Sequence, residues 1–104
     1  MSLADRHCVP ESPLLDDATV ASLHKQIPDW KVVGGQQLSK SFTFPDFATA
    51  LAFVNRVGEV AEAEGHHPDL HLTWGRVDAA LSTHSAGGLT ESDFVLAAKI
   101  DRAR

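Results

Sequence analysis

In the sequence EAEGHHPDLHLTW, Glu62–Trp74, the spacing of apolar residues changes from the period of a helix to the period of a strand. Upstream, the apolar residues of 47–61 recur every three or four positions, as they do on the buried face of a helix. Gly65 suits the left-handed conformation that ends many helices, and Pro68 prevents the helix from continuing. Beyond Pro68, apolar and polar residues alternate, which is the period of a strand. We therefore predict a helix that ends at Gly65, followed at once by a strand.

Further elements are predicted on both sides of this junction. They lie at 16–28 (helix), 30–33 and 38–44 (hairpin), 70–74 and 77–81 (hairpin) and 90–100 (helix). The order α-β-β-α-β-β-α indicates an α+β fold, in which a four-stranded antiparallel sheet carries three helices on one face. The residues expected to supply core from the strands are Phe42, Phe44, Leu70, Leu72 and Trp74.

The length of 104 residues fits a single domain. Residues 1–13 contain two prolines and no periodicity, so we expect a flexible leader at 1–13 and one domain at 14–104. The net charge of −5 opposes binding to nucleic acid, and no apolar run is long enough for a membrane span. Cys8 is the only cysteine, which excludes an intrachain disulfide and a cysteine-based zinc site and favours a cytoplasmic location.

Histidine is the unusual feature of the composition, because four of the six histidines lie between His66 and His84. An unperturbed imidazole has a pKa of about 6.5, so such a cluster suggests proton transfer or a metal site. His67 and His71 have the i, i+4 spacing of a helical metal pair, but Pro68 places them on an extended segment, about 13 Å apart. We therefore favour proton transfer and expect no metal.

The neighbours of these histidines suggest how they are held. Glu62 lies four residues before His66, so the two share one face at the end of the helix and the carboxylate can orient the imidazole. His84 follows a strand and precedes the glycine-containing segment 85–88, which is a typical place for a functional residue. Asp93 caps the last helix, orients His84, or does both. The alternative for each histidine is a purely structural role, as the cap of a helix or as a solvent-exposed residue at the end of a strand.

Seven positions carry a pattern with fixed spacings, namely Glu62, His66, His67, Pro68, Trp74, His84 and Asp93. This pattern resembles the signature of the pterin-4a-carbinolamine dehydratases. The similarity covers roughly residues 14–101 and includes Trp30, whereas Gly65 and Ser85 stand where many members have an acidic residue. The resemblance implies the same sheet with three helices on one face. It also implies dehydration of 4a-hydroxytetrahydrobiopterin to quinonoid dihydropterin, a hydro-lyase reaction that recycles the tetrahydropterin cofactor of aromatic amino-acid hydroxylases.

The resemblance further implies a role for each residue of the pattern. His66, His67 and His84 are the expected catalytic residues, with His66 and His84 as the acid/base pair around the 4a-hydroxyl. Glu62 and Asp93 are expected to support them. The expected substrate-binding residues are Trp30, His67, Ser82 and Thr83, with core packing as the alternative role of Trp30. Because the reaction consists of proton transfers at near-neutral pH, it requires no metal and no other cofactor.

Other functions remain open at this point. The main alternative is a non-catalytic dimerisation or coactivator-type module of the same fold, which binds a protein. Further alternatives are a relative that acts near molybdopterin metabolism and a small metal-binding protein. The expected partners are the pterin substrate, further copies of the chain in a homodimer or homotetramer, and an aromatic amino-acid hydroxylase as metabolic partner. Neither nucleic acid nor a membrane is an expected partner.

Overall fold

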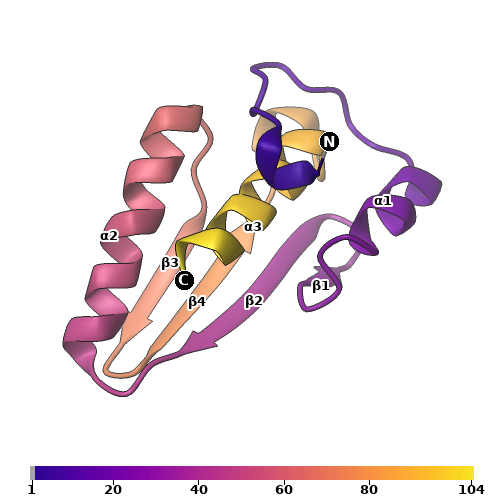
Figure 1. Ribbon diagram of the computed structural model, residues 1–104. Coiled ribbons are helices and arrows are strands. Elements are labelled where there is room, and N and C mark those ends of the chain that lie inside the picture. Colours follow the sequence, from indigo (N-terminus) through magenta and orange to yellow (C-terminus); the bar gives the residue numbers. More distant parts are fainter. Residues whose placement is uncertain (1) are drawn as a thin grey trace.

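A computed structural model of the protein describes residues 2–104. Within these residues the helices and strands follow the predicted order α-β-β-α-β-β-α, with short 3-10 turns added (Figure 1). The elements are η1 (Leu3–Asp5), α1 (Asp17–His24), β1 (Lys31–Val33), β2 (Gln37–Thr43), α2 (Phe47–Glu64), β3 (Asp69–Thr73), β4 (Arg76–Leu81), η2 (His84–Ala86) and α3 (Glu91–Ala103). Helix α1 ends before the predicted stop at Pro28, because Gln26 and Ile27 donate to carbonyls three residues back and so form tight turns.

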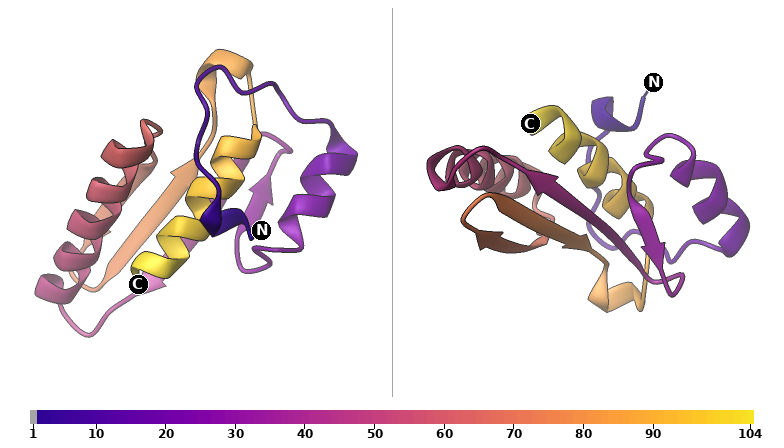
Figure 2. Two further views of the ribbon diagram at one scale, coloured as in Figure 1. Left: turned by 45° about the horizontal axis from the view of Figure 1, so that its top comes forward. Right: turned by 90° about the horizontal axis from the view of Figure 1, so that it is seen from below.

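The strands of the described chain form one antiparallel, four-stranded sheet in the order β1-β2-β4-β3. The central strands β2 and β4 pair Phe42 with Val77 and Leu38 with Leu81. The α-helices cover one face of this sheet, with α2 against β3 and β4 and α3 against β2 (Figure 2). The arrangement confirms the predicted α+β fold with helices on one face.

The core lies between the sheet and the two long helices. Phe42 of β2, Phe53 of α2 and Phe94 of α3 are fully buried there, and the rings of Phe42 and Phe53 lie 4.8 Å apart between centroids. The prediction that Trp74 supplies core is wrong, because its side chain is 68% exposed. Trp74 lies in the turn beyond Thr73, the last paired residue of β3, so the alternation of the strand no longer applies to it. The other predicted strand residues are buried or partly buried against the core.

The leader, expected to be flexible, is packed against α3 over the residues that the structure describes, which leave out Met1. Leu3 is only 2% exposed, and Figure 1 shows η1 lying beside α3. Lys99 donates to the carbonyl of Ala4 at 3.0 Å, and Arg102 donates to Asp5 at 3.1 Å. The segment shows no periodicity because it forms no long helix or strand, yet Lys99 and Arg102 of α3 bind its polar groups and its residue Leu3 is covered.

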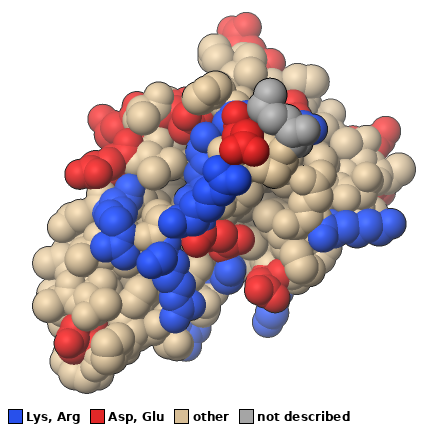
Figure 3. Space-filling view, viewed as in Figure 1, with Lys and Arg blue, Asp and Glu red and all other residues tan. Residues whose placement is uncertain are grey.

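The surface above α2 and α3 carries a band of lysine and arginine side chains, although the chain as a whole is acidic (Figure 3). Arginines of the helical layer bind nearby carbonyl oxygens, since Arg56 donates to Ala103 and Arg104 donates to Thr43, both at 2.7 Å. They therefore join elements of the fold to one another. Among the helices of residues 2–104, none combines the length and the apolar character needed to cross a bilayer.

Candidate active site

The junction between α2 and β3 places the paired histidines. Gly65 adopts a left-handed conformation with φ 65°, and its N–H donates to the carbonyl of Ala61, as predicted for the end of the helix. The chain leaves the helix at this residue, so His66 and His67 do not continue the α2 spiral. The i, i+4 relation between Glu62 and His66 consequently does not hold in the structure.

His66 is bound to Asp93 of α3. The distance from His66 Nε2 to Asp93 Oδ1 is 2.6 Å, and the imidazole is 17% exposed whereas the carboxyl group is fully buried. The second oxygen of Asp93 accepts from the N–H of Thr90 at 2.9 Å and from the hydroxyl of Thr83 at 2.8 Å. Asp93 thus completes the predicted capping box of α3 and holds the ring of His66 at the same time.

This contact also defines the chemistry open to His66. A carboxylate only accepts hydrogen bonds, so Nε2 of His66 carries the proton that is shared with Asp93. The other ring nitrogen, Nδ1, then remains to accept or to donate a proton.

Glu62 binds His67 rather than His66. Its Oε2 contacts Nε2 of His67, and both side chains are mostly exposed, at 79% and 60%. The expectations that Glu62 orients His66 and that Asp93 orients His84 are therefore wrong. Glu62 binds His67, and Asp93 binds His66. The change follows from Gly65, which turns the chain between Glu62 and the histidines.

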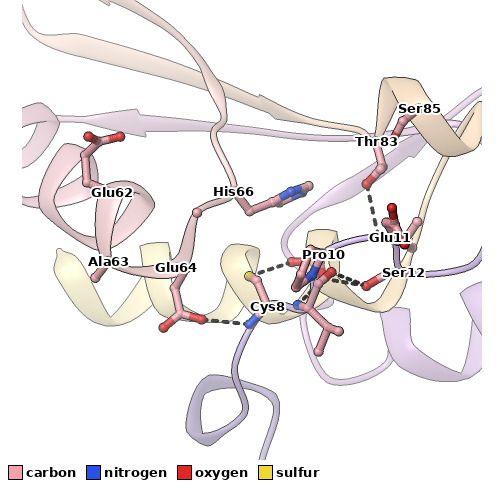
Figure 4. A pocket seen from close by; sticks show the side chains of 14 residues that line it. Cys8, Pro10, Glu11, Ser12, Glu62, Ala63, Glu64, His66, Thr83 and Ser85 are labelled. Atoms are coloured by element: carbon pink, nitrogen blue, oxygen red, sulfur yellow. Dashed lines mark hydrogen bonds between the residues drawn. The ribbon is translucent and has the colours of Figure 1, made fainter.

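A cavity of about 460 Å³ opens beside His66, and its size suits a small heterocyclic ligand. The end of α2 forms one wall, and residues 8–12 of the leader form another (Figure 4). Thr83 and Thr90, both hydrogen-bonded to Asp93, also line it. His66 thus meets the cavity with its nitrogen Nε2 already fixed by the buried carboxylate.

His84 lies in η2 and is exposed, and it lines another cavity, of about 520 Å³. Ser82, Thr83 and the loop after β1 share that cavity with His84. Thr83 lines both this cavity and the one beside His66. The structure therefore brings His84 to the same end of the sheet as His66, with Thr83 common to their surroundings.

Trp30 lies in the core, where it is 1% exposed and lines neither of these cavities. Its indole N–H donates to the carboxylate of Asp101, at 3.1 and 3.2 Å from the two oxygens. Lys40 also donates to Asp101, at 2.7 Å. Of the two roles considered for Trp30, the structure places it in core packing rather than against substrate.

Sequence reasoning missed two residues that shape the cavity, Glu64 and Ser92. Glu64 accepts the N–H of Cys8 at 2.7 Å and lies 3.0 Å from His7 Nδ1, and Lys99 is 3.8 Å away. Burial acts to raise the pKa of Glu64, but these hydrogen bonds and the charge of Lys99 outweigh it and lower that pKa. Burial, together with the charge of Glu64, raises the pKa of the Cys8 thiol to about 12. No local pattern signals these contacts, because they join residues far apart in the sequence; Cys8 and Glu64, for example, are separated by 56 positions.

A metal site would need several ligating side chains at one place. Over residues 2–104 no three histidine, cysteine, aspartate or glutamate side chains gather in a group that could hold a metal ion. The adjacent histidines His66 and His67 instead bind separate carboxylates, Asp93 and Glu62 respectively.

The chain is similar to known proteins over nearly all of its length. A family model described as pterin 4 alpha carbinolamine dehydratase matches residues 12–103. Proteins provisionally named pterin-4-alpha-carbinolamine dehydratase are 50% identical in Rubrobacter xylanophilus (96% of each chain) and 54% identical in Chlorobium limicola (88% of this chain, 87% of that one). A crystal structure described as a transcriptional coactivator/pterin dehydratase from Brucella melitensis has a TM-score of 0.80 and 33% identity, over 86% of this chain and 96% of that one. A pterin dehydratase-like protein described as a RuBisCO assembly factor in the alpha-carboxysome has a TM-score of 0.62 and 25% identity, over 72% of this chain and 88% of that one. By these similarities, the chain belongs to the pterin-4-alpha-carbinolamine dehydratase family.

Proposed function

We propose that this chain catalyses loss of water from 4a-hydroxytetrahydropterin, giving quinonoid dihydropterin. The observation that carries the proposal is the hydrogen bond between His66, beside a cavity, and the fully buried Asp93. Membership of the family supports the substrate class. The product, quinonoid dihydropterin, is an intermediate in the recycling of tetrahydropterin. Tetrahydropterin is the cofactor of aromatic amino-acid hydroxylases, so such a hydroxylase is the proposed source of the substrate.

The reaction needs one proton delivered to the departing 4a-hydroxyl and one proton removed from a ring nitrogen of the pterin. Imidazole performs both tasks near neutral pH, and a well-placed acid or base contributes about 10²–10⁴-fold to the rate. In the proposed mechanism, Nδ1 of His66 exchanges the proton with the substrate while Asp93 keeps Nε2 protonated. Because Asp93 is held by Thr83 and Thr90, the ring does not need to reorient during the reaction.

His84 is the proposed second proton-transfer group. It shares Thr83 with the surroundings of His66, and it is exposed and therefore accessible to a ligand. His67, fixed by Glu62, is proposed to position the pterin at the mouth of the site. Ser82 and Thr83 are proposed to contact the substrate on the side of His84.

A stopped-flow assay tests the proposal. Phenylalanine hydroxylase generates the 4a-carbinolamine, and its dehydration is followed with and without this protein. Wild-type protein should accelerate the step, and His66→Ala and His84→Ala should each reduce the acceleration at least about tenfold. His24→Ala serves as a control, since His24 lies outside both cavities. No acceleration by the wild type would refute the enzymatic proposal.

A protein-binding role of the coactivator type is the second candidate, favoured by the description of the Brucella melitensis structure. Phe47 and Leu51 on α2 are 45% and 40% exposed, and the edge strands β1 and β3 end the sheet, so the fold offers surface for association. We propose a homodimer or homotetramer, which light scattering would measure. A stable complex with another protein, in the absence of dehydratase activity, would favour this role over the enzyme.

A further inference from the structure

The leader carries one carboxylate, Glu11, on the wall of the cavity beside His66. Pro10 and Glu11 form a turn, and Glu11 has φ 59°, the one positive value at a non-glycine position in residues 2–104. The left-handed conformation is unfavourable for a residue with a Cβ, and glycine is the usual choice at such a turn position. The turn therefore keeps a glutamate where the backbone alone favours glycine.

This turn is fixed to the start of α3, next to Asp93. The N–H of Val9 donates to the hydroxyl of Ser92 at 3.0 Å, and the hydroxyls of Ser12 and Ser92 are 2.8 Å apart. Ser12 also closes the turn by donating to the carbonyl of Val9 at 2.7 Å. Ser92 is buried and directly precedes Asp93, the partner of His66, so the turn is bound to a well-packed residue next to that pair.

The other carboxylates on the cavity wall already have partners. Glu62 binds His67, and Glu64 accepts from Cys8 and contacts His7. Within the described residues, no side chain or backbone N–H donates a hydrogen bond to Glu11. Figure 4 shows the ring of His66 directed from the end of α2 toward the side of the cavity where Thr83 and Glu11 lie. Glu11 thus offers two acceptor oxygens to a ligand that reaches His66.

We propose that Glu11 is a substrate-binding residue that recognises the amidine edge of the pterin, formed by the ring N3–H and the 2-amino group. A carboxylate accepts two parallel N–H donors in a bidentate arrangement, and these two donors lie side by side on a 2-amino-4-oxopteridine. Recognition of this edge by Glu11 holds the C4a end of the ring system toward the histidines. The inference rests on the proposed function, since it takes the pterin as substrate.

Binding of two stable pteridines tests the proposal without catalysis. Pterin carries the 2-amino group, whereas lumazine has a carbonyl oxygen in its place. Calorimetry on the wild type should show pterin bound roughly tenfold more tightly than lumazine, and Glu11→Gln should lose most of this preference. Glu59→Gln removes the same charge from an exposed position of α2 outside the cavity, and it should retain the full preference. A tenfold preference that persists in Glu11→Gln overturns the proposal.

A second variant separates recognition from folding. Glu11→Gly removes the carboxylate and suits the positive φ, so its urea midpoint should be no lower than that of the wild type while the preference for pterin is lost. In the dehydratase assay, both Glu11 variants should raise KM with little change in kcat, because Glu11 acts away from the 4a-hydroxyl. If the wild type dehydrates the substrate, and the Glu11 variants have the same KM and the same preference for pterin over lumazine, this proposal alone is overturned. A wild type that neither binds pterin nor dehydrates the substrate overturns the proposed function together with it.

Discussion

At the scale of single residues, Asp93 contributes both to the stability of the fold, by capping α3, and to the proposed chemistry, by binding His66. One oxygen holds His66 and the other accepts from Thr83 and Thr90, so both oxygens of the carboxyl group are engaged. A side chain with only one acceptor oxygen cannot serve all three donors. This makes Asp93 the residue whose loss affects both the start of α3 and the candidate catalytic histidine.

We expect Asp93→Asn to lower the rate of carbinolamine dehydration roughly tenfold to a hundredfold, because His66 loses its carboxylate. The variant should also lose about 1–3 kcal/mol of unfolding free energy, since a buried donor is left without its acceptor. Stopped-flow kinetics and urea denaturation measure the two effects. Asp16→Asn makes the same change at the N-cap of α1, away from any histidine partner, and should leave activity unchanged. Wild-type kinetics in Asp93→Asn would contradict the role of the pair.

Cys8 is expected to be a poorly reactive thiol in the folded protein. Its pKa is raised to about 12 by burial and by the charge of Glu64, so almost no thiolate is present near neutral pH. Reaction with a disulfide reagent at about pH 8 should be more than tenfold slower in the native chain than in denaturant. Equal rates in the two states would show that the thiol is neither buried nor influenced by Glu64.

At the scale of elements, the end of α2 is fixed by one backbone conformation. Gly65 has φ 65°, and a Cβ added there would meet no atom within 4 Å, so the cost of Gly65→Ala is conformational. The substitution should lower the unfolding free energy by about 1 kcal/mol in urea denaturation. Gly58→Ala, inside α2 with open space around a Cβ, should instead raise stability by roughly 0.5–1 kcal/mol. Equal effects at both positions would contradict the special role of the Gly65 cap.

The elements were predictable from sequence because their signals are local. Gly65 and Pro68 mark the end of α2, and the capping box of Thr90 and Asp93 marks the start of α3, as the structure confirms. The contacts between elements were not predictable in the same way. Helical spacing suggested that Glu62 holds His66, but that rule applies only inside a helix. In the structure Glu62 binds His67, and His66 is bound by Asp93. Partners such as Cys8 and Glu64 depend on tertiary packing, which spacing does not encode.

At the scale of the whole molecule, the charges predict a loss of stability in acid. Asp5, Asp16, Asp46 and Asp78 have lowered pKa values because of hydrogen bonds from neighbouring side chains and N–H groups. The pKa of Glu64 is lowered as well, since its hydrogen bonds and Lys99 outweigh burial. The unfolded chain therefore binds more protons than the folded chain when the pH falls below the ordinary carboxyl range.

The stabilisation from these groups is fully present above their unfolded pKa values of 3.8 and 4.5, and it is lost as the pH falls through their lower folded values. The urea midpoint should therefore be nearly constant above about pH 5 and decrease between about pH 5 and pH 2. Glu64→Gln should lower the midpoint at pH 6 and make the decrease shallower, because one of the linked groups is removed. A midpoint independent of pH across this range would contradict the assignment.

The packed leader has a consequence for the order in which the chain acquires its structure. The contact between Val9 and Ser92 spans 83 positions, whereas that between Glu62 and His67 spans five. Closing a long loop costs more chain entropy than closing a short one, and during synthesis the first segment emerges well before α3 exists. The histidine turn can thus form while translation is under way, but the cavity gains its leader wall only after α3 has left the ribosome. Competence to bind a ligand is accordingly expected to be among the last properties that the nascent polypeptide acquires.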